Sequence, residues 1–587
     1  MVGALAKYLK FVVWLQILIF VPKIAFVQNP AKVRKFHPPL AIPMVLSGSF
    51  GEVRSGHLHS GIDIKTQGRT GKKVFAVASG YVSRIKVSPG GYGKALYITH
   101  PNGLVSVYGH LSRFNYALQK FVRKVQYARK SFAVNIFPKK GMFKIKKGSV
   151  IAYSGNSGSS GAPHLHFELR EAKTQSPVNP LLYKGINVAD HQFPKIYRLA
   201  VYPVSTGSCI NGRDNKFIYP VAGRGKKCYL RNIPVIKVNG SVALGLQTND
   251  IMDKASNRNG IYKISLYKDG KLIFGLRMKK ISFYTTRDVN SLIDYAYYQQ
   301  TKRRIIRTQI DTNNRLKNYF DVINSGIISF KDRKVHHFKF VVTDIYHNIS
   351  VLKFNMQSVG DKGCVKKYAF VKKPGKNIKV SIDKVEKVVY PGIKLDIPAG
   401  AFYKSFMMNI RKTNQQVSNV SPVYIIQDRY VPVRKSFSLS LKINPIKGID
   451  LSKYFLAYSP QGKWKYPSFA GGKVKNGFIT SRVNKLGYYT VLFDTVAPVV
   501  KAVNFVNKGR LKAKRSLIVS IKDNISGIRS YRPILNGHWI LMDYDPKTAR
   551  LIYKFDKYIK KGKNNFSLLV YDGVGNKTDY KAVFYKP

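Results

Sequence analysis

Histidines gather in a short stretch near the N-terminus, where their types and spacing suit metal chemistry. Six of the chain's 12 histidines lie between residues 57 and 166, far more than an even spread over 587 residues would place there. They are His57, His59, His100, His110, His164 and His166. Such a concentration of titratable, metal-ligating side chains predicts a functional site in this region.

Two of these segments have the spacing of a zinc site. His164-Leu165-His166 is predicted to lie on a strand, where residues two apart point to the same face. His59 and Asp63 lie four residues apart across a turn that contains Gly61. One carboxylate and two neutral imidazoles make a three-ligand set for zinc, and three protein ligands leave a position for water, as in catalytic sites. Zinc lowers the pKa of such a water to about 7 and polarises a carbonyl, as amide hydrolysis requires.

Three motifs in this region resemble those of the lysostaphin and LytM type of zinc metallopeptidase. They are the segments 55–63 (SGHLHSGID), 105–111 (VSVYGHL) and 155–168 (GNSGSSGAPHLHFE), and they follow the order found in that family. The resemblance covers roughly residues 45 to 184. It implies an antiparallel β peptidase domain that holds one Zn²⁺ per chain.

The resemblance also implies a role for each matching residue. The family's zinc ligands match His59, Asp63 and His166, and the two histidines that activate water and stabilise the tetrahedral oxyanion match His110 and His164. A neutral imidazole can take a proton and a protonated one can donate to developing negative charge, so either histidine can play either part. His57 remains an alternative ligand to His59, and His100 is expected to be a turn or supporting residue.

The activity implied by this resemblance is hydrolysis of peptide cross-links in peptidoglycan by metal-activated water. The alternative is a non-catalytic envelope regulator that uses the same domain to activate a cell-wall amidase, as relatives that lose their ligands do. This chain keeps all five positions, which favours catalysis. One departure from the family is Ala162, where glycine is common.

The elements that must position these residues are predicted to be strands. Between residues 40 and 184 short alternating strands are separated by glycine turns, as in Lys94 to His110 with the turn Pro101-Asn102-Gly103. Between Phe114 and Ala133 apolar residues recur at helical spacing, which predicts a helical insertion.

Beyond Pro180 the strand and glycine pattern continues to the C-terminus, and the chain is therefore predicted to be mainly β. Asp344 to Asn348 and Asp572 to Asn576 share an Asp-x-x-x-Asn turn after an apolar strand, with a looser copy at Asp523. This echo predicts immunoglobulin-like sandwiches. We expect a metallopeptidase domain at 29–188, a β-sandwich at 189–358 with a helix at 288–304, a β-rich module at 359–494 and an immunoglobulin-like module at 495–587. The C-terminal modules are candidates for binding an envelope protein partner.

The N-terminus predicts export. Lys7 and Lys10 precede an apolar run from Phe11 to Val21, which is typical of a secretory signal and short for a membrane span. Residues 1–28 are therefore interpreted as a signal peptide or an uncleaved membrane anchor, and the protein as periplasmic or associated with the cell envelope.

Charge and cysteine content identify no further partner. The net charge of +73 is the excess of 101 Lys and Arg over 28 Asp and Glu, and the basic residues are spread over the whole length. Without a basic stripe or a reader motif, specific nucleic-acid binding is not expected. Cys209 and Cys228 could close a short loop, which would leave Cys364 alone.

Overall fold

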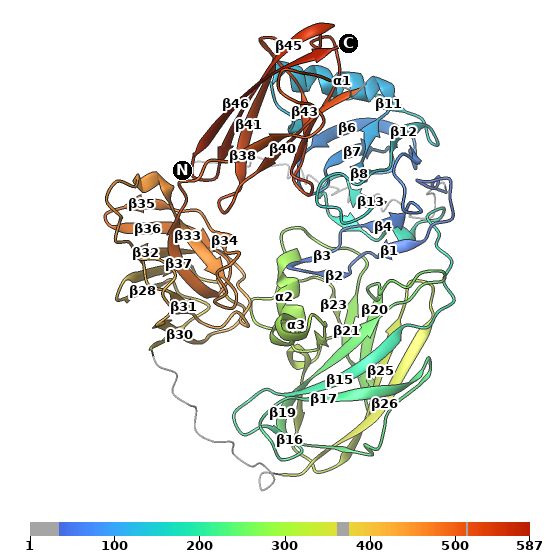
Figure 1. Cartoon of the computed structure of the whole chain (residues 1–587). Coiled ribbons are helices and arrows are strands. Elements are labelled where there is room, and N and C mark those ends of the chain that lie inside the picture. Colours follow the sequence, from blue (N-terminus) through green and yellow to red (C-terminus); the bar gives the residue numbers. More distant parts are fainter. Residues whose placement is uncertain (1–34, 361–374, 512–514) are drawn as a thin grey trace, which may run out of the picture.

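The computed structural model describes residues 35–360, 375–511 and 515–587, and it consists mostly of β-strands in four units (Figure 1). We name them the N-terminal domain (35–188), the second module (189–358), the third module (375–494) and the fourth module (495–587). The predicted mainly β fold is confirmed. The expected signal or anchor at 1–28 lies outside the described residues. Within the described part of the chain, no helix has the length and apolar character to cross a membrane.

The N-terminal domain is built around a nine-stranded antiparallel sheet with a smaller sheet and a hairpin beside it. The main sheet has the order β1-β4-β13-β8-β7-β6-β10, and β11 and β14 pair with β6 and β13. The bounds are β1 Leu46–Gly48, β4 Ile62–Lys65, β6 Gly80–Val87, β7 Lys94–Thr99, β8 Leu104–Leu111, β10 Val134–Ile136, β11 Lys144–Ile145, β13 His164–Glu171 and β14 Pro177–Val178. The small sheet joins β5 Lys73–Phe75, β12 Val150–Tyr153 and β9 Arg113–Phe114, and the hairpin joins β2 Val53–Arg54 to β3 His57–Leu58.

The predicted helical insertion is confirmed as α1 (Tyr116–Ala128). The side chain of Asn115 accepts a hydrogen bond from the Leu118 backbone N–H and so caps the first turn. Leu118, Val122 and Gln126, spaced four residues apart, form its buried face. Arg123 of the same helix contacts Asp556 of the fourth module.

The second module closes its strands into one 12-stranded arrangement, because the long β19 pairs with both β15 and β26. Its strands are β15 Lys195–Pro203, β16 Cys209–Ile210, β17 Phe217–Arg224, β18 Lys227–Leu230, β19 Ile236–Asn249, β20 Lys263–Lys268, β21 Lys271–Arg277, β22 Ile306–Arg307, β23 Tyr319–Phe320, β24 Ile327–Phe330, β25 Val335–Thr343 and β26 Ile349–Ser358. The helix expected at 288–304 is broken into η3 (Thr286–Asp288), α2 (Val289–Leu292) and α3 (Tyr295–Thr301). Short η turns also occur at Pro180–Leu182 and Asn324–Gly326.

The suggested bridge between Cys209 and Cys228 is wrong. Cys228 keeps a free, buried thiol. The Cys228 thiol instead donates to the Gly225 carbonyl at 3.3 Å.

The third and fourth modules each contain two sheets. Those of the third have the orders β27-β30-β31-β37-β33-β34 and β28-β29-β32-β36-β35, and those of the fourth β38-β40-β44-β43 and β39-β46-β45-β41-β42. The third-module strands are β27 Lys376–Val380, β28 Glu386–Tyr390, β29 Ile393–Ile397, β30 Phe406–Lys412, β31 Tyr424–Ile426, β32 Phe437–Lys442, β33 Tyr454–Ser459, β34 Ser468–Phe469, β35 Lys473–Lys475, β36 Phe478–Val483 and β37 Gly487–Phe493, with the turn η6 at Leu451–Lys453. The fourth-module strands are β38 Val499–Ala502, β39 Gly509–Arg510, β40 Ser516–Lys522, β41 Ile528–Leu535, β42 His538–Trp539, β43 Met542–Asp545, β44 Arg550–Lys554, β45 Gly562–Asp572 and β46 Lys577–Lys586.

The N-terminal domain and the second module share one continuous hydrophobic core, whereas the third and fourth modules each have their own. Their contact includes backbone bonds, such as that from Asn179 N–H to the Lys279 carbonyl at 3.0 Å. Ser49 also donates its hydroxyl to the carbonyl of Gly260 at 3.2 Å. The second module therefore supports the loop that precedes β2.

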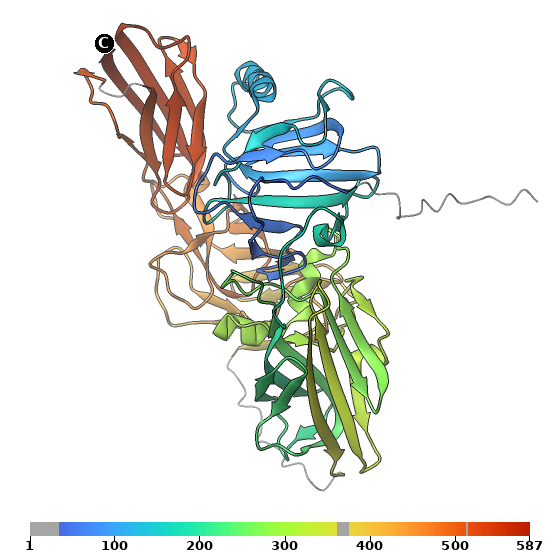
Figure 2. The same ribbon diagram turned by 90° about the vertical axis from the view of Figure 1, so that its right-hand side faces the viewer.

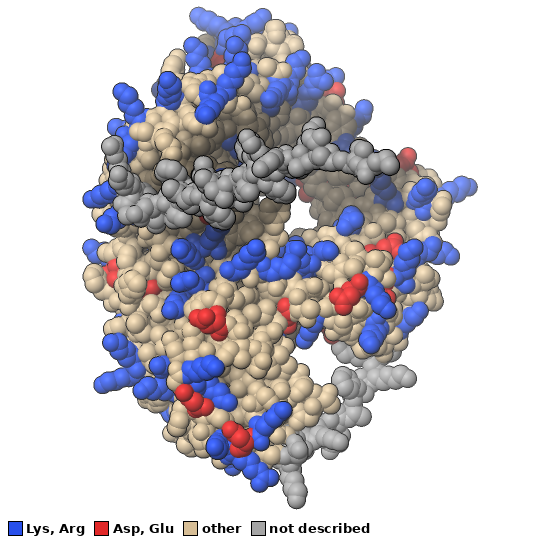
Figure 3. All heavy atoms as spheres, turned by 180° about the vertical axis from the view of Figure 1, so that it is seen from behind, with Lys and Arg blue, Asp and Glu red and all other residues tan. Residues whose placement is uncertain are grey.

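The four units form a ring in which the fourth module returns to the N-terminal domain (Figures 1 and 2). The second and third modules meet where the Tyr403 hydroxyl donates to the Arg287 carbonyl at 3.0 Å. The ring closes through α1, because Arg123 forms an ion pair with Asp556 at 2.6 Å. Figure 3 shows an opening through the molecule, and it shows many basic and few acidic side chains over the visible face.

Candidate metal centre

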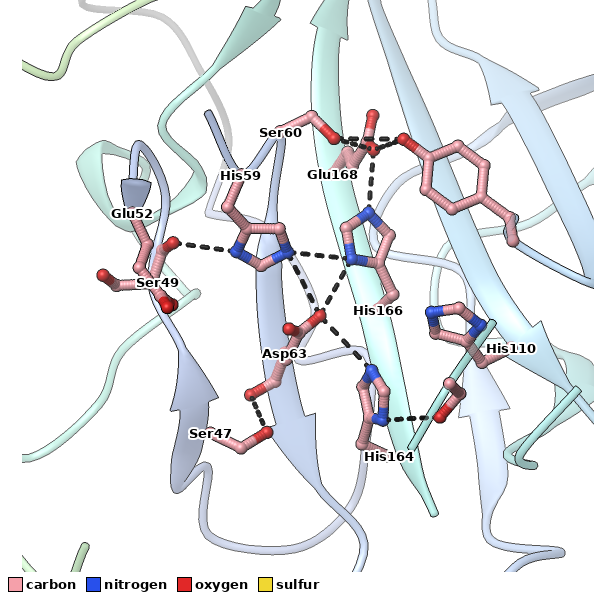
Figure 4. Close-up of polar contacts among 12 residues, drawn as sticks. Ser47, Ser49, Glu52, His59, Ser60, Asp63, His110, His164, His166 and Glu168 are labelled. Atoms are coloured by element: carbon pink, nitrogen blue, oxygen red, sulfur yellow. Dashed lines mark hydrogen bonds and ion pairs between the residues drawn. The ribbon is translucent and has the colours of Figure 1, made fainter. Parts of the chain in front are cut away.

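Three adjacent strands of the main sheet carry four of the five residues singled out in the sequence. Asp63 on β4 lies directly opposite His166 on β13, and His166 faces Gly109 on β8 from its other side. His59 lies just before β4. The structure brings His59, Asp63 and His166 together with the two other histidines (Figure 4).

One atom from each of three side chains converges on a common point. His59 Nε2 lies 3.1 Å from His166 Nδ1, and Asp63 Oδ1 lies 2.9 Å from His166 Nδ1 and 3.2 Å from His59 Nε2. Ligands of a tetrahedral zinc ion with bonds of 2.0–2.1 Å are roughly 3.3 Å apart. The spacing of these three atoms therefore fits a zinc ion.

Hydrogen bonds on the outer side of both imidazoles set their tautomers. His59 Nδ1 lies 2.8 Å from the Ser49 carbonyl oxygen, and His166 Nε2 lies 2.8 Å from Glu168 Oε1. Both partners only accept, so these outer nitrogens carry the N–H. In the neutral rings the lone pairs of His59 Nε2 and His166 Nδ1 then point at Asp63 Oδ1, as metal ligation requires.

Charges in the cluster favour an ionised carboxylate. Burial alone would raise the pKa of Asp63, but the charge of His59 and hydrogen bonds from His164 and His166 hold that pKa well below its usual range. Burial would lower the pKa of His166, yet its bonds to Asp63 and Glu168 raise it to about 9. The carboxylates of Asp63 and Glu168 therefore favour a positive charge at this cluster.

His110 lies at a bulge at the end of β8. The pairing with β7 shifts register between Lys94 and Leu96, and His110 adopts φ +58°. A bulge of this kind re-aims a side chain, and a left-handed non-glycine residue beside a site is a recurrent functional feature. His110 Nδ1 donates to the Ser157 carbonyl at 2.8 Å. Burial and the neighbouring His166 and His164 lower its pKa to about 3, so the ring is neutral near pH 7.

His164 lies between His110 and the ligand cluster. Its ring centre is 4.8 Å from that of His110, and its Nε2 lies 3.4 Å from Asp63 Oδ1. Its Nδ1 donates to the Ala162 carbonyl at 2.8 Å and also lies 3.1 Å from the Ser160 hydroxyl. The loop at 154–162 therefore orients both His110 and His164.

Sequence reasoning missed Glu168, although a signal for it was present. His164, His166, Glu168 and Arg170 alternate along β13, so they share one face while the leucines and Phe167 enter the core. Glu168 is fully buried. Besides His166 it contacts the Ser60 hydroxyl at 2.6 Å, the Tyr92 hydroxyl at 2.5 Å and Arg170 Nε at 2.5 Å.

A second residue absent from the sequence-based set is Arg54, on the hairpin beside the site. Its Nη2 lies 2.5 Å from Asp63 Oδ2 and 3.5 Å from Glu52 Oε2. Arg54 therefore binds the carboxylate oxygen that faces away from the histidines. Nothing in the spacing of the sequence motifs distinguishes this arginine from the others.

The two remaining histidines of the region lie outside the cluster. His57 is exposed on β3, where its Nδ1 contacts the Ser55 carbonyl at 3.1 Å. His100 is buried and contacts the Ser79 carbonyl at 2.9 Å and the Ser106 hydroxyl at 2.8 Å. His57 is therefore not placed to substitute for His59 as a ligand.

Two families of known proteins match parts of this chain. Residues 57–128 match the model of peptidase family M23, and residues 377–494 match the model of the Zu5-like domain. The M23 match includes His59, Asp63 and His110 and ends with α1, before β13. The third module corresponds to the Zu5-like match.

Individual proteins are similar to about a fifth to a quarter of the chain. The chain is 34% identical over 124 residues to the DD-carboxypeptidase/endopeptidase Mpg of Neisseria meningitidis, which is 21% of this chain and 22% of that protein. It is 33% identical over 129 residues, 22% of this chain and 34% of that protein, to the lipoprotein NlpD/LppB homolog of Pseudomonas aeruginosa. The catalytic domain of the prophage-encoded M23 protein EnpA from Enterococcus faecalis matches 25% of this chain and 95% of its own at 29% identity and a TM-score of 0.19.

These similarities confirm the predicted resemblance to peptidases, and the matched M23 residues lie in the N-terminal domain. The N-terminal domain is similar to peptidase domains of family M23. The chain spans only about a fifth of the length of the Mpg relatives that it matches.

Proposed function

We propose that this protein is an exported zinc-dependent endopeptidase that hydrolyses peptide cross-links of peptidoglycan. The observation that carries the proposal is the convergence of His59 Nε2, Asp63 Oδ1 and His166 Nδ1, with both ring N–H groups turned outward. The assigned ligands are these three residues. A zinc ion held there would supply Lewis acidity for water activation and for polarisation of the scissile carbonyl.

His110 and His164 are the proposed catalytic residues. The Nδ1–H of His110 is engaged by Ser157, so its neutral Nε2 is able to accept a proton from water. The Nδ1–H of His164 is engaged by Ala162, so a protonated His164 would donate from Nε2, on the side of the cluster. This division assigns proton acceptance to His110 and stabilisation of the developing oxyanion to His164.

The substrate class and location rest on similarity and on the N-terminal sequence. The matched relatives are named as a DD-carboxypeptidase/endopeptidase and as a lipoprotein, which fits an envelope location and a peptidoglycan peptide as substrate. Lys7 and Lys10, followed by the apolar run from Phe11 to Val21, support export. The C-terminal modules remain candidates for contact with an envelope partner.

The second candidate is a non-catalytic regulator of a cell-wall amidase. The similarity to the lipoprotein NlpD/LppB homolog supports this second candidate. A regulator needs the fold but not the proton-handling histidines. The presence of His110 and His164 beside a complete ligand set favours the endopeptidase.

The deciding experiment is zinc-dependent release of muropeptides from purified peptidoglycan by the full chain. His110→Ala and His164→Ala are expected to lower the rate by about 10²–10⁴-fold. Zinc content, measured by mass spectrometry, should stay at one ion per chain, because neither residue is an assigned ligand. His57→Ala is the matched control, since His57 is exposed and outside the cluster.

Retention of full activity by both variants would contradict the catalytic assignment. Bound zinc without any cleavage by the wild-type chain, together with stimulation of an added amidase, would favour the regulator.

A further inference from the structure

Two clusters of three aspartates lie outside the peptidase site, each where a linker joins a β module. Their carboxylate oxygens lie within 4.8 Å of one another in each cluster. The first cluster, at the start of the second module, consists of Asp190, Asp250 and Asp344. The second, at the start of the fourth module, consists of Asp494, Asp523 and Asp572.

The two clusters have the same construction although they belong to different modules. Asp344 and Asp572 each open an Asp-x-x-x-Asn turn, and the Asn348 and Asn576 backbone N–H groups donate to their Oδ1 atoms at 2.8 Å. The side-chain amides donate to the Oδ2 atoms at 2.6 and 2.7 Å. The sequence echo between the modules is therefore a structural repeat.

The same asparagine also holds the linker. Asn348 Nδ2 donates to the Asp190 carbonyl at 3.3 Å, and Asn576 Nδ2 donates to the Asp494 carbonyl at 2.8 Å. Each turn thus fixes the position of an aspartate in the linker from the preceding unit, Asp190 in the first cluster and Asp494 in the second. The third member follows an inner strand, as Asp250 after β19 and Asp523 after β40.

In each cluster a buried carboxylate oxygen has no hydrogen-bond partner among the residues that the structure describes. Oδ1 of Asp190 accepts from the Gln192 N–H, and Oδ1 of Asp494 accepts from the Val496 N–H. Their Oδ2 atoms are buried and unpaired, and these two residues are only 7% and 2% exposed. A buried polar atom left in this way costs free energy unless something binds it.

Within residues 35–360, 375–511 and 515–587, no lysine or arginine neutralises the clusters. Among the described residues none of the six aspartates forms an ion pair with Lys or Arg, although the chain has 101 of these residues and only 28 Asp and Glu. Burial and neighbouring carboxylates raise the pKa of Asp190 to about 7, and that of Asp250 to about 8. Three carboxylates so close together repel one another without a cation.

We propose that each cluster binds one calcium ion. The ligands are hard carboxylate oxygens without a histidine or cysteine among them, which suits Ca²⁺ rather than zinc. Calcium accepts irregular sets of six to eight oxygens, whereas Mg²⁺ demands near-ideal octahedral geometry. The paired sites are separate from the peptidase centre and do not depend on its activity.

Calcium at these positions would fix how the modules follow one another. The first ion would tie the linker residue Asp190 to two strand ends of the second module. The second would tie Asp494 to the fourth module in the same way. Because Asp556 and Lys547 of the fourth module contact the N-terminal domain, the second ion would also fix that contact.

The test uses the full chain, stripped of metal, reloaded with one equivalent of zinc and titrated with calcium by calorimetry. We expect two calcium ions per chain, with dissociation constants of about 0.1–1 mM as in extracellular modules. The melting temperature should rise by about 3–8 °C at saturating calcium. This comparison needs no mutation, so it does not depend on the folding of a variant.

Two substitutions locate the ions. Asp572→Asn should leave one calcium per chain, whereas Asp579→Asn, the same change at an exposed position of the same module, should leave two. Absence of calcium binding and of any change in melting temperature at about 10 mM calcium would overturn the proposal. So would two ions retained by Asp572→Asn, or binding of Mg²⁺ or Zn²⁺ in place of calcium.

Discussion

Lys547 of the fourth module donates a hydrogen bond to the Ser160 carbonyl of the N-terminal domain at 3.1 Å. The same ammonium contacts the Asn156 carbonyl. The hydroxyl of Ser160 lies against His164, and the neighbouring Ser157 carbonyl accepts from His110. The C-terminal end of the chain therefore contacts the loop that orients both proposed catalytic histidines.

Loss of this contact should loosen the loop. In Lys547→Ala two backbone carbonyls lose their ammonium donor, so the amides of residues 156–162 are expected to exchange hydrogen about 5–10-fold faster, which corresponds to about 1 kcal/mol. Hydrogen exchange with mass spectrometry measures this. Lys561→Ala, an exposed lysine of the same module, is the control. Unchanged exchange in Lys547→Ala would mean that the contact does not restrain the loop.

Glu168 should tune metal affinity without touching the metal. Glu168→Gln keeps the shape of the side chain but removes the charge that holds the N–H of His166 outward. We expect zinc affinity to fall about 10–100-fold, measured by competition with a chromophoric chelator. Glu171→Gln, at the exposed end of the same strand, should have wild-type affinity. Equal affinities for both variants would rule out this role.

Gly61 should be needed for the approach of β4 to β13. A Cβ at this position would lie 2.3 Å from the Phe167 carbonyl oxygen. Gly61→Ala is therefore expected to lower the free energy of unfolding of the N-terminal domain by about 2–3 kcal/mol, as read from urea denaturation. Gly161→Ala, where an added Cβ meets nothing within 4 Å, should be close to neutral. Equal stability of the two variants would contradict the close packing of these strands.

The contact between α1 and the fourth module should weaken in acid. Burial would raise the pKa of Asp556, but hydrogen bonds from Tyr127 and Tyr553 and from Arg123 lower it below the usual 3.8. The stabilisation is therefore complete above that value and is lost as the pH falls below it toward the depressed native pKa. At pH 7, Asp556→Asn should reduce protection of α1 by about 1 kcal/mol.

Protection factors from hydrogen exchange at pH 7 and pH 3 check this expectation. The difference between wild type and Asp556→Asn should shrink at pH 3. A difference that stays constant over this range would show that the carboxylate charge is not what holds the contact. Asp579→Asn serves as the control for the loss of an exposed charge.

Spacing along one strand was predictable from the sequence, whereas the grouping of the five residues was expected from the family resemblance. Asp63 and His166 lie opposite each other in the β4 and β13 register, and alternation along β13 places His164 on the same face as His166. The left-handed backbone of His110 was not predictable, because a bulge depends on the pairing of two strands and not on one local pattern.

The outer parts of the fold depended more on tertiary context. The helix expected from 288 to 304 is interrupted at Ile293 and Asp294, where Asp294 caps the next helix instead. The second module closes its strands through the pairings of β19, which link segments far apart in the chain. Local propensity does not encode such long-range pairings.

The ring also explains how a small interface can persist. Arg123, Lys94 and Lys547 contact the fourth module through partly exposed ion pairs and hydrogen bonds, each of which contributes little on its own, and Tyr127 packs against Trp539 and Tyr558. A tether turns such binding into an intramolecular event with an effective concentration in the millimolar range. Chain connectivity, rather than affinity, then keeps the fourth module at the loop. Cleavage of the chain between the N-terminal domain and the fourth module would remove this effective concentration, and the fourth module would then dissociate on dilution.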